Sequence, residues 1–317
     1  MIQHVLVPLD GSPLAESALT HARAVARAFG AKITLLRVQE PNAKGPGGVV
    51  DALRSRFARA ECGSYVEGLV KRLRDQGLRA NGTAAEGDPS EEILRTARDS
   101  GVDLLVLCWH GRGGSEDPVL GATALKVLAR SPVSVLLTRA AVRAEGTDGS
   151  SEIRYRRIMA PLDCSQRAHW ALLQAMPLAQ AQSSELLLVH VVSPPTFARR
   201  TPPLPHEIAL ARQLAEEDRR LAARYLADTR RSLGAGGLSV RTLLLESSQV
   251  VQTLDRAARE EDVDLVVVSA HGLSGLAPWP YGSVADRLIH YGGKPLLVLQ
   301  DAAAGQGAEQ EPAARVA

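Results

Sequence analysis

HVLVPLD, residues 4–10, opens the chain with an apolar run that ends in Pro-Leu-Asp, and RIMAPLD repeats this pattern at residues 157–163. The apolar residues do not alternate with polar ones, which is typical of a strand buried on both faces of a parallel sheet. The two aspartates, Asp10 and Asp163, lie 153 positions apart. A repeat of this length predicts a duplicated module.

Three further pairs of matching stretches follow in the same order in both halves of the chain. They are Ile33–Val38 with Leu186–Val191, the VDLLVL that starts at Val102 with the VDLVVV that starts at Val263, and the SPVSVLL that starts at Ser131 with the KPLLVL that starts at Lys294. The offset grows from 153 positions at the first of these pairs to 161 at the second and 163 at the third. Four matches in order indicate a tandem duplication, with a few extra residues in the second copy.

Within each copy, short apolar segments alternate with segments of helical length. We expect strands at residues 3–9, 32–38, 78–85, 103–108 and 133–138, and again at 157–162, 185–192, 239–245, 264–270 and 295–299. Helices are expected between them at 13–29, 51–76, 89–100 and 119–130, and at 166–182, 206–233, 249–261 and 281–290. This pattern predicts an α/β protein of two tandem, doubly wound domains, each with a five-stranded parallel sheet of the Rossmann-like, adenine nucleotide-binding type.

The composition suggests where the domains end. We expect the two domains at residues 1–139 and 156–300, joined by a linker at 140–155 that contains the polar stretch EGTDGSSE. The tail at 301–317 is rich in Ala, Gly, Gln and Glu, and we expect it to be disordered.

Charge and cysteine usage exclude several classes of function. The 317 residues carry a formal net charge of +2, which provides no field to attract nucleic acid or an anionic membrane. The three cysteines form no CxxC pair, as suits a reducing compartment. The first residues lack the basic start and long apolar stretch of a signal peptide. We therefore expect a cytoplasmic protein without nucleic-acid or membrane partners.

Two loops of each copy are expected to meet at the carboxyl edge of its sheet, where open parallel sheets bind ligands. The loop after the first strand contains Asp10 in one copy and Asp163 in the other. The loop after the fourth strand contains two glycines ten positions apart in both copies: Gly111 with Gly121, and Gly272 with Gly282. Glycine is needed where the backbone approaches a ligand closely or adopts positive φ.

Gly282 is expected to begin a helix, whose free N–H groups and dipole would favour a phosphate group. Ser283 would add a hydroxyl donor. No GK[ST] follows, so the loop is not a Walker A loop. In the alternative reading, Gly282 and Ser283 only begin a helix beside a turn.

Simpler roles are open for the polar residues of these loops. Asp10 and Asp163 could serve only as helix caps. His110 and His271 lack a nearby nucleophile and a repeated acidic partner, so we expect them to contribute backbone contacts and packing rather than catalysis.

The VPLD at residues 7–10, the APLD at 160–163 and the two glycine loops resemble the universal stress protein family in its tandem form. The resemblance covers about residues 3–139 and 156–300. ATP-binding members of that family carry Gly-x-x-Gly, nine residues, and then Gly-Ser or Gly-Thr. The resemblance therefore implies ATP as the ligand, alone or with Mg²⁺.

The same resemblance assigns roles to residues of the second copy. Asp163 would hold the adenosine end and Val191 would line the base pocket, while ribose and phosphates would lie against Gly272, Gly282, Ser283 and Val284, with Pro161 and His271 completing the site. The corresponding positions of the first copy are Asp10, Val38, Gly111 and Gly121.

Departures from the family pattern distinguish the two copies. Cys108 and Ser269 replace the first glycine of Gly-x-x-Gly, so a Cβ could crowd the path of the ribose or phosphate. The first copy also has Ala122 where a hydroxyl belongs, and its Glu116 and Asp117 would repel a triphosphate unless Mg²⁺ intervened. We therefore expect the better nucleotide site in the second copy and a degenerate site in the first.

Three functions are compatible with these features. The favoured one is a non-catalytic, ATP-binding stress-response protein that senses or buffers adenine nucleotide, and slow ATP hydrolysis stays open. An enzyme such as an adenylating ligase is disfavoured, because no Ser-Gly-Gly-x-Asp-Ser loop follows the first strand. The third is a dimerisation scaffold that has lost nucleotide binding.

The last strand of each copy is apolar and would lie at an edge of its sheet. Family members commonly pair through this edge, and an exposed edge strand invites pairing. Residues 133–137 and 296–299 could thus pair within one chain, as an intramolecular pseudo-dimer, and two chains could associate further as a homodimer.

Overall fold

The computed structural model describes residues 2–40, 49–109, 120–139, 153–194, 204–272 and 280–300. The expected tail at 301–317 and most of the expected linker at 140–155 lie outside these residues, as do Gly111, His110, Glu116 and Asp117.

The described elements alternate between strand and helix in both halves. The first half contains β1 (His4–Leu9), α1 (Pro13–Phe29), β2 (Lys32–Gln39), α2 (Val49–Asp75), β3 (Ala80–Glu86), α3 (Pro89–Asp99), β4 (Leu104–Cys108), α4 (Ala122–Arg130) and β5 (Ser134–Thr138). The second half contains β6 (Arg157–Pro161), α5 (Gln166–Gln182), β7 (Glu185–Val192), α6 (Pro205–Ala235), β8 (Ser239–Glu246), α7 (Val250–Glu260), β9 (Leu265–Ser269), α8 (Ser283–Tyr291) and β10 (Leu296–Leu299).

Within the described residues, the strands form one sheet in the order β3-β2-β1-β4-β5-β10-β9-β6-β7-β8. Pairing is parallel inside each half, so the expected doubly wound α/β fold is confirmed. The register also repeats: His4 pairs with Lys32 in the first half as Arg157 pairs with Glu185 in the second. Arg157 and Glu185 each lie 153 positions after their counterparts His4 and Lys32, which is the offset of the sequence repeat.

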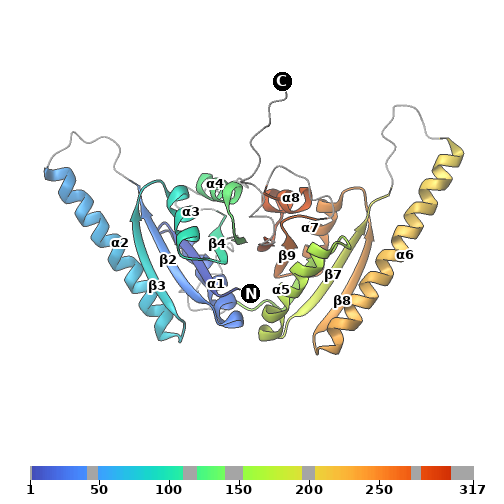
Figure 1. The fold of residues 1–317 in the computed structure, drawn as a ribbon, viewed down its shortest axis with the longest axis horizontal. Helices are drawn as coiled ribbons and strands as arrows, with labels where there is room; N and C mark the ends of the chain where they lie inside the picture. Colours follow the sequence, from blue (N-terminus) through green and yellow to red (C-terminus); the bar gives the residue numbers. More distant parts are fainter. Residues whose placement is uncertain are drawn as a thin grey trace, which may run out of the picture.

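The halves meet where β5 pairs antiparallel with β10. Leu136 lies opposite Leu297, and both side chains are buried. Each half therefore covers the edge strand of the other, and the sheet continues through the whole molecule (Figure 1).

The sheet buries apolar side chains on both faces, as its unbroken apolar strands predict. One cluster of buried residues joins the sheet to α1, α2, α5 and α6, and a second joins it to α3, α4, α7 and α8. Both clusters extend across the two halves, so a single three-layered structure results (Figure 1). Among the described helices, none is long and apolar enough to cross a membrane.

A second contact between the halves involves α1 and the residues that precede β6. His21 of α1 is buried, and its Nδ1 lies 2.6 Å from the hydroxyl oxygen of Tyr155, which is also buried. Burial lowers the pKa of His21 to about 4, so the imidazole is neutral at physiological pH.

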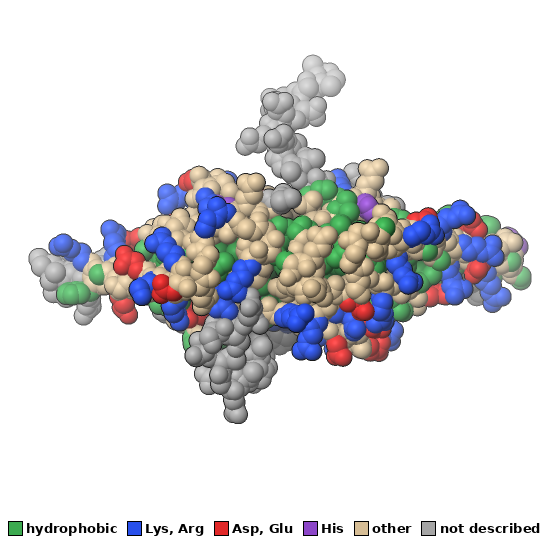
Figure 2. All heavy atoms as spheres, turned by 90° about the horizontal axis from the view of Figure 1, so that it is seen from below, with side chains coloured by type: hydrophobic (Ala, Val, Ile, Leu, Met, Phe, Trp, Pro, Cys, Tyr) green, Lys and Arg blue, Asp and Glu red, His purple; other side chains and the backbone are tan. Residues whose placement is uncertain are grey.

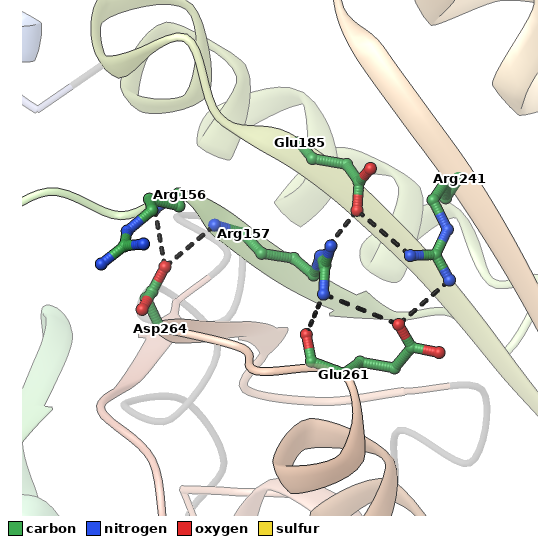
Figure 3. Close-up of polar contacts among 6 residues, drawn as sticks. All are labelled: Arg156, Arg157, Glu185, Arg241, Glu261 and Asp264. Atoms are coloured by element: carbon green, nitrogen blue, oxygen red, sulfur yellow. Dashed lines mark hydrogen bonds and ion pairs between the residues drawn. The ribbon is translucent and has the colours of Figure 1, made fainter.

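At the amino edge of the second half, three elements are joined by ion pairs (Figure 3). The Nε of Arg157 on β6 lies 2.6 Å from Glu185 of β7, and Arg241 of β8 contacts both Glu185 and Glu261. In the first half, His4 takes the place of Arg157 and contacts the Thr34 hydroxyl and the Ser100 carbonyl. The duplicated halves thus share their fold but differ in the polar contacts at this edge.

Candidate functional site

A cavity of about 340 Å³ lies at the carboxyl ends of the strands of the second half. It is bounded by β6, β7 and β9, by α7 and by the start of α8. Its lining residues are Pro161, Leu162, Asp163, Val189, His190, Val191, Val250, Leu254, Val268, Ser269, Ala270, Gly272, Gly282, Ser283, Val284 and Ala285. Seven of the positions expected from the sequence are therefore brought together: Pro161, Asp163, Val191, Gly272, Gly282, Ser283 and Val284.

One end of the cavity is apolar. Val189 and Val191 lie on the same face of β7, and Val250 and Leu254 face them from α7. Only Val191 was expected here. The two-residue period of a strand would have added Val189, whereas Val250 and Leu254 depend on how α7 packs against the sheet.

Asp163 lies at the start of the loop that joins β6 to α5. Its Oδ1 accepts a hydrogen bond from the Ser165 backbone N–H at 3.0 Å. The Ser165 hydroxyl in turn caps α5 by accepting from the Ala168 N–H at 3.1 Å. The reading of Asp163 as a helix cap is therefore wrong, because the serine caps the helix and the aspartate orients the loop.

The other carboxylate oxygen of Asp163 lies against Gly272. A Cβ on Gly272 would stand 2.3 Å from Asp163 Oδ2, which is far inside van der Waals contact. The second loop can therefore approach the first only because residue 272 has no side chain. This contact joins two loops that are more than 100 positions apart in the chain.

Gly282 precedes the first residue of α8, and its N–H donates to the Ala270 carbonyl at 2.6 Å. Its φ is −69°, and a Cβ there would lie 3.5 Å from its nearest neighbours, which is ordinary contact. Position 282 therefore does not need a glycine for positive φ or for its protein neighbours, and close approach of its backbone to a ligand stays a prediction. What the structure does show is that the N-terminus of α8 borders the cavity.

Ser269, expected to crowd the site, turns its hydroxyl back into the loop. Its Oγ donates to the His271 carbonyl at 2.6 Å. His271 is not among the described residues that line the cavity, and a contact of His271 with nucleotide stays a prediction.

The first half is built on the same plan but with different side chains. Asp10 Oδ1 accepts from the Ser12 N–H at 2.8 Å, and Ser12 caps α1. Val38 packs against the cluster that joins the sheet to α3 and α4, and Gly121 precedes the first residue of α4. Asp10, Val38 and Gly121 thus occupy the places that the repeat predicts.

Trp109 marks the main difference between the halves. The backbone N–H of Trp109 donates to the Thr138 carbonyl, just as the backbone N–H of Ala270 donates to the Leu299 carbonyl. Trp109 and Ala270 are therefore equivalent positions of the two halves. Ala270 lines the cavity, whereas the Trp109 indole is buried beneath the Arg139 guanidinium, whose carbon lies 3.6 Å from the ring centroid. The sequence already shows this difference, because alignment of the two loops places Trp109 opposite Ala270.

The comparisons with known proteins agree with the duplication. A model of the universal stress protein family matches residues 1–139 and 154–300, which is most of the chain. The chain belongs to the universal stress protein family. It is the tandem, two-domain form, since the match occurs once in each half.

Single-domain relatives match about half of this universal stress protein. A universal stress protein of Thermus aquaticus is 31% identical over 147 residues, which are 44% of this chain and 100% of the relative. One from Methanocaldococcus jannaschii is 28% identical over 156 residues, 44% of this chain and 96% of the relative. A solved universal stress protein structure from Archaeoglobus fulgidus has a TM-score of 0.64 at 17% identity and covers 94% of this chain and 98% of its own, which supports the fold.

Proposed function

We propose that the second half of this universal stress protein binds ATP in the cavity between β6, β7, β9, α7 and α8. The observation that carries the proposal is one cavity lined both by apolar side chains of β7 and α7 and by the N-terminus of α8. An adenine ring fits the slot between Val191 and Leu254, and phosphates fit the N-terminus of α8, where the dipole and free N–H groups favour anions. A volume of about 340 Å³ is typical of small-molecule sites.

The side chains present suit this ligand. The Asp163 carboxylate lines the cavity beside Gly272, where it can accept hydrogen bonds from the adenosine moiety. Gly272 lets its loop lie directly against that carboxylate, and the Ser283 hydroxyl and backbone can donate to phosphate. ATP, with or without Mg²⁺, would be held here chiefly by backbone donors and apolar contact.

We propose binding without efficient turnover. Of the described residues that line the cavity, only Asp163 and His190 carry a carboxylate or an imidazole. His190 Nδ1 is held 2.6 Å from the Leu162 carbonyl, and Asp163 is held by the Ser165 N–H. Both groups therefore have structural partners, which favours a nucleotide sensor or buffer over a hydrolase.

The first half would then be a degenerate site, a view that the Trp109 indole and the missing hydroxyl at Ala122 support. The antiparallel contact of β5 with β10 would make the chain an intramolecular pseudo-dimer with one working site. Binding of ATP in the second half could reach the first through this continuous sheet.

The test is a calorimetric titration of nucleotide-stripped protein with ATP and Mg²⁺. We expect about one ATP per chain, abolished by Gly282→Val, whose branched side chain would press against the backbone of residues 270–272 at the cavity, and retained by the matched Gly121→Val. Retention of both affinity and stoichiometry in Gly282→Val would place the site elsewhere. No binding at millimolar ATP would instead leave the dimerisation scaffold, and rapid phosphate release would indicate an ATPase.

A further inference from the structure

The lining of the nucleotide cavity carries little positive charge for a triphosphate. Among the described residues that line it, one has a carboxylate and none is a lysine or an arginine. The N-terminus of α8 and the Ser283 hydroxyl offset only part of the charge of three phosphates. Binding of ATP therefore calls for a cation from outside this lining.

Arg287 of α8 is in a position to supply that cation. It lies one turn after Ser283, which lines the cavity. Residues four apart share a helix face, and a helical side chain points back toward the N-terminus of its helix. Arg287 is exposed and has no ion-pair partner within the described part of the chain. Its guanidinium can therefore extend toward the edge of the cavity.

The first half shows what the equivalent side chain contacts. Lys126 of α4 lies 161 positions before Arg287, and α3 and α4 precede α7 and α8 by the same offset. The Nζ of Lys126 lies 3.9 Å from Oδ2 of Asp88, the residue that caps α3. A basic side chain at this position thus reaches the N-terminus of the helix beside its own.

Asp88 places a negative charge on the N-terminus of α3. Its Oδ1 accepts hydrogen bonds from the backbone N–H of Ser90 at 2.9 Å and of Glu91 at 3.1 Å, while its Oδ2 faces Lys126. The helix dipole and the ammonium group both favour an anion at this point.

The second half keeps the two positive groups but replaces the carboxylate. Gln249 stands in the place of Asp88 and makes no side-chain hydrogen bond to the N-terminus of α7. Arg287 stands in the place of Lys126. Val250, the first residue of α7, lines the cavity, so this N-terminus lies at the cavity edge. The anion that the first half builds into the chain must come from a ligand in the second.

We propose that Arg287 is a nucleotide-binding residue, and that it holds the outer phosphates of ATP together with the N-terminus of α7. A phosphate then occupies the place that the Asp88 carboxylate has in the first half. A guanidinium binds phosphate oxygens through charge-assisted hydrogen bonds, often two at once. The inference rests on the proposed binding of ATP, and it names the residue that distinguishes ATP from adenosine, which has no phosphate.

Calorimetric titrations of the full chain with ATP and with adenosine test the role of Arg287. We expect Arg287→Gln to lower the affinity for ATP by at least about tenfold and the affinity for adenosine by less than about threefold. The matched Lys126→Gln should leave both affinities unchanged. An unchanged affinity for ATP in Arg287→Gln, or equal losses for both ligands, would overturn the inference. If the unaltered protein bound neither ligand, the proposed function would fail.

Gln249→Asp tests the geometry without nucleotide. Its carboxylate should cap α7 as Asp88 caps α3 and should pair with Arg287, so the denaturant midpoint of unfolding should rise. The rise should be smaller in the double variant with Arg287→Gln, which removes the partner. Additive effects would show that Arg287 does not reach the N-terminus of α7, and would overturn the inference whether or not ATP binds. With ATP, Gln249→Asp should lower the affinity by at least about tenfold, because its carboxylate takes the place of the phosphate.

Discussion

Gly272 lies so close to Asp163 that the smallest side chain cannot be added without moving one of them. The aspartate has little freedom to move, because it is short and its other oxygen is held by the Ser165 N–H. The site in the second half therefore depends on one residue without a side chain, at a place where two distant loops meet.

We predict that Gly272→Ala lowers ATP affinity by at least about tenfold, because the added Cβ displaces the Asp163 carboxylate. Gly282→Ala is the matched control. Its Cβ would stand 3.5 Å from its neighbours, so affinity should change by less than about threefold. Calorimetric titration of both variants measures the difference, and equal losses would contradict the role given to the contact with Asp163.

At the scale of elements, the helices that follow the first strand of each half begin in the same way. Ser12 caps α1 and Ser165 caps α5, and the aspartate two residues before each serine accepts from the serine N–H. The repeat thus preserves a complete strand-to-helix turn and not only a sequence pattern.

We expect Ser12→Ala and Ser165→Ala each to lower the free energy of unfolding by about 1 kcal/mol, since each removes the side-chain acceptor for an N–H of the first helical turn. Denaturant unfolding of the two variants measures this loss. Similar losses are expected, because the two caps have the same 3.1 Å geometry. A loss from only one variant would show that the caps are not equivalent.

Charged side chains of both signs lie on the face of the molecule shown in Figure 2. Basic and acidic groups are interspersed over the face shown in Figure 2, in keeping with the net charge of +2. The apolar interior, by contrast, is continuous from one half to the other. Stability of the molecule should therefore depend on groups buried between the halves.

His21 is such a group, and it makes stability depend on pH. Its pKa is lowered to about 4 in the folded chain, from 6.5 in the unfolded chain, so the unfolded state binds the proton first as pH falls. The stability that the neutral imidazole confers is present above pH 6.5 and is lost progressively between pH 6.5 and about 4. The loss amounts to about 3 kcal/mol at most.

Denaturant unfolding at pH 7.5, 6, 5 and 4.5 would measure this dependence. In His21→Gln the side chain can still contact the Tyr155 hydroxyl but cannot titrate, so its profile should be flatter over this range. Parallel profiles for the two proteins would show that His21 is not the group responsible.

Much of this architecture was already determined by the sequence alone. The unbroken apolar strands, the glycine spacing and the VPLD and APLD stretches predicted the duplication, the doubly wound fold and seven of the sixteen residues that line the second-half cavity. These predictions succeed because strand burial and helix starts depend on residues that are close together in the chain.

Contacts between distant segments were decided only by the tertiary structure. No local pattern places Gly272 against Asp163, turns the Ser269 hydroxyl toward the His271 carbonyl, or brings Val250 and Leu254 over the apolar slot. The partner of an apolar edge strand is equally undetermined, since any free edge can accept it. The pairing of β5 with β10 depends on how the two halves pack into one sheet, and this packing involves the sheet and the helices on both of its faces.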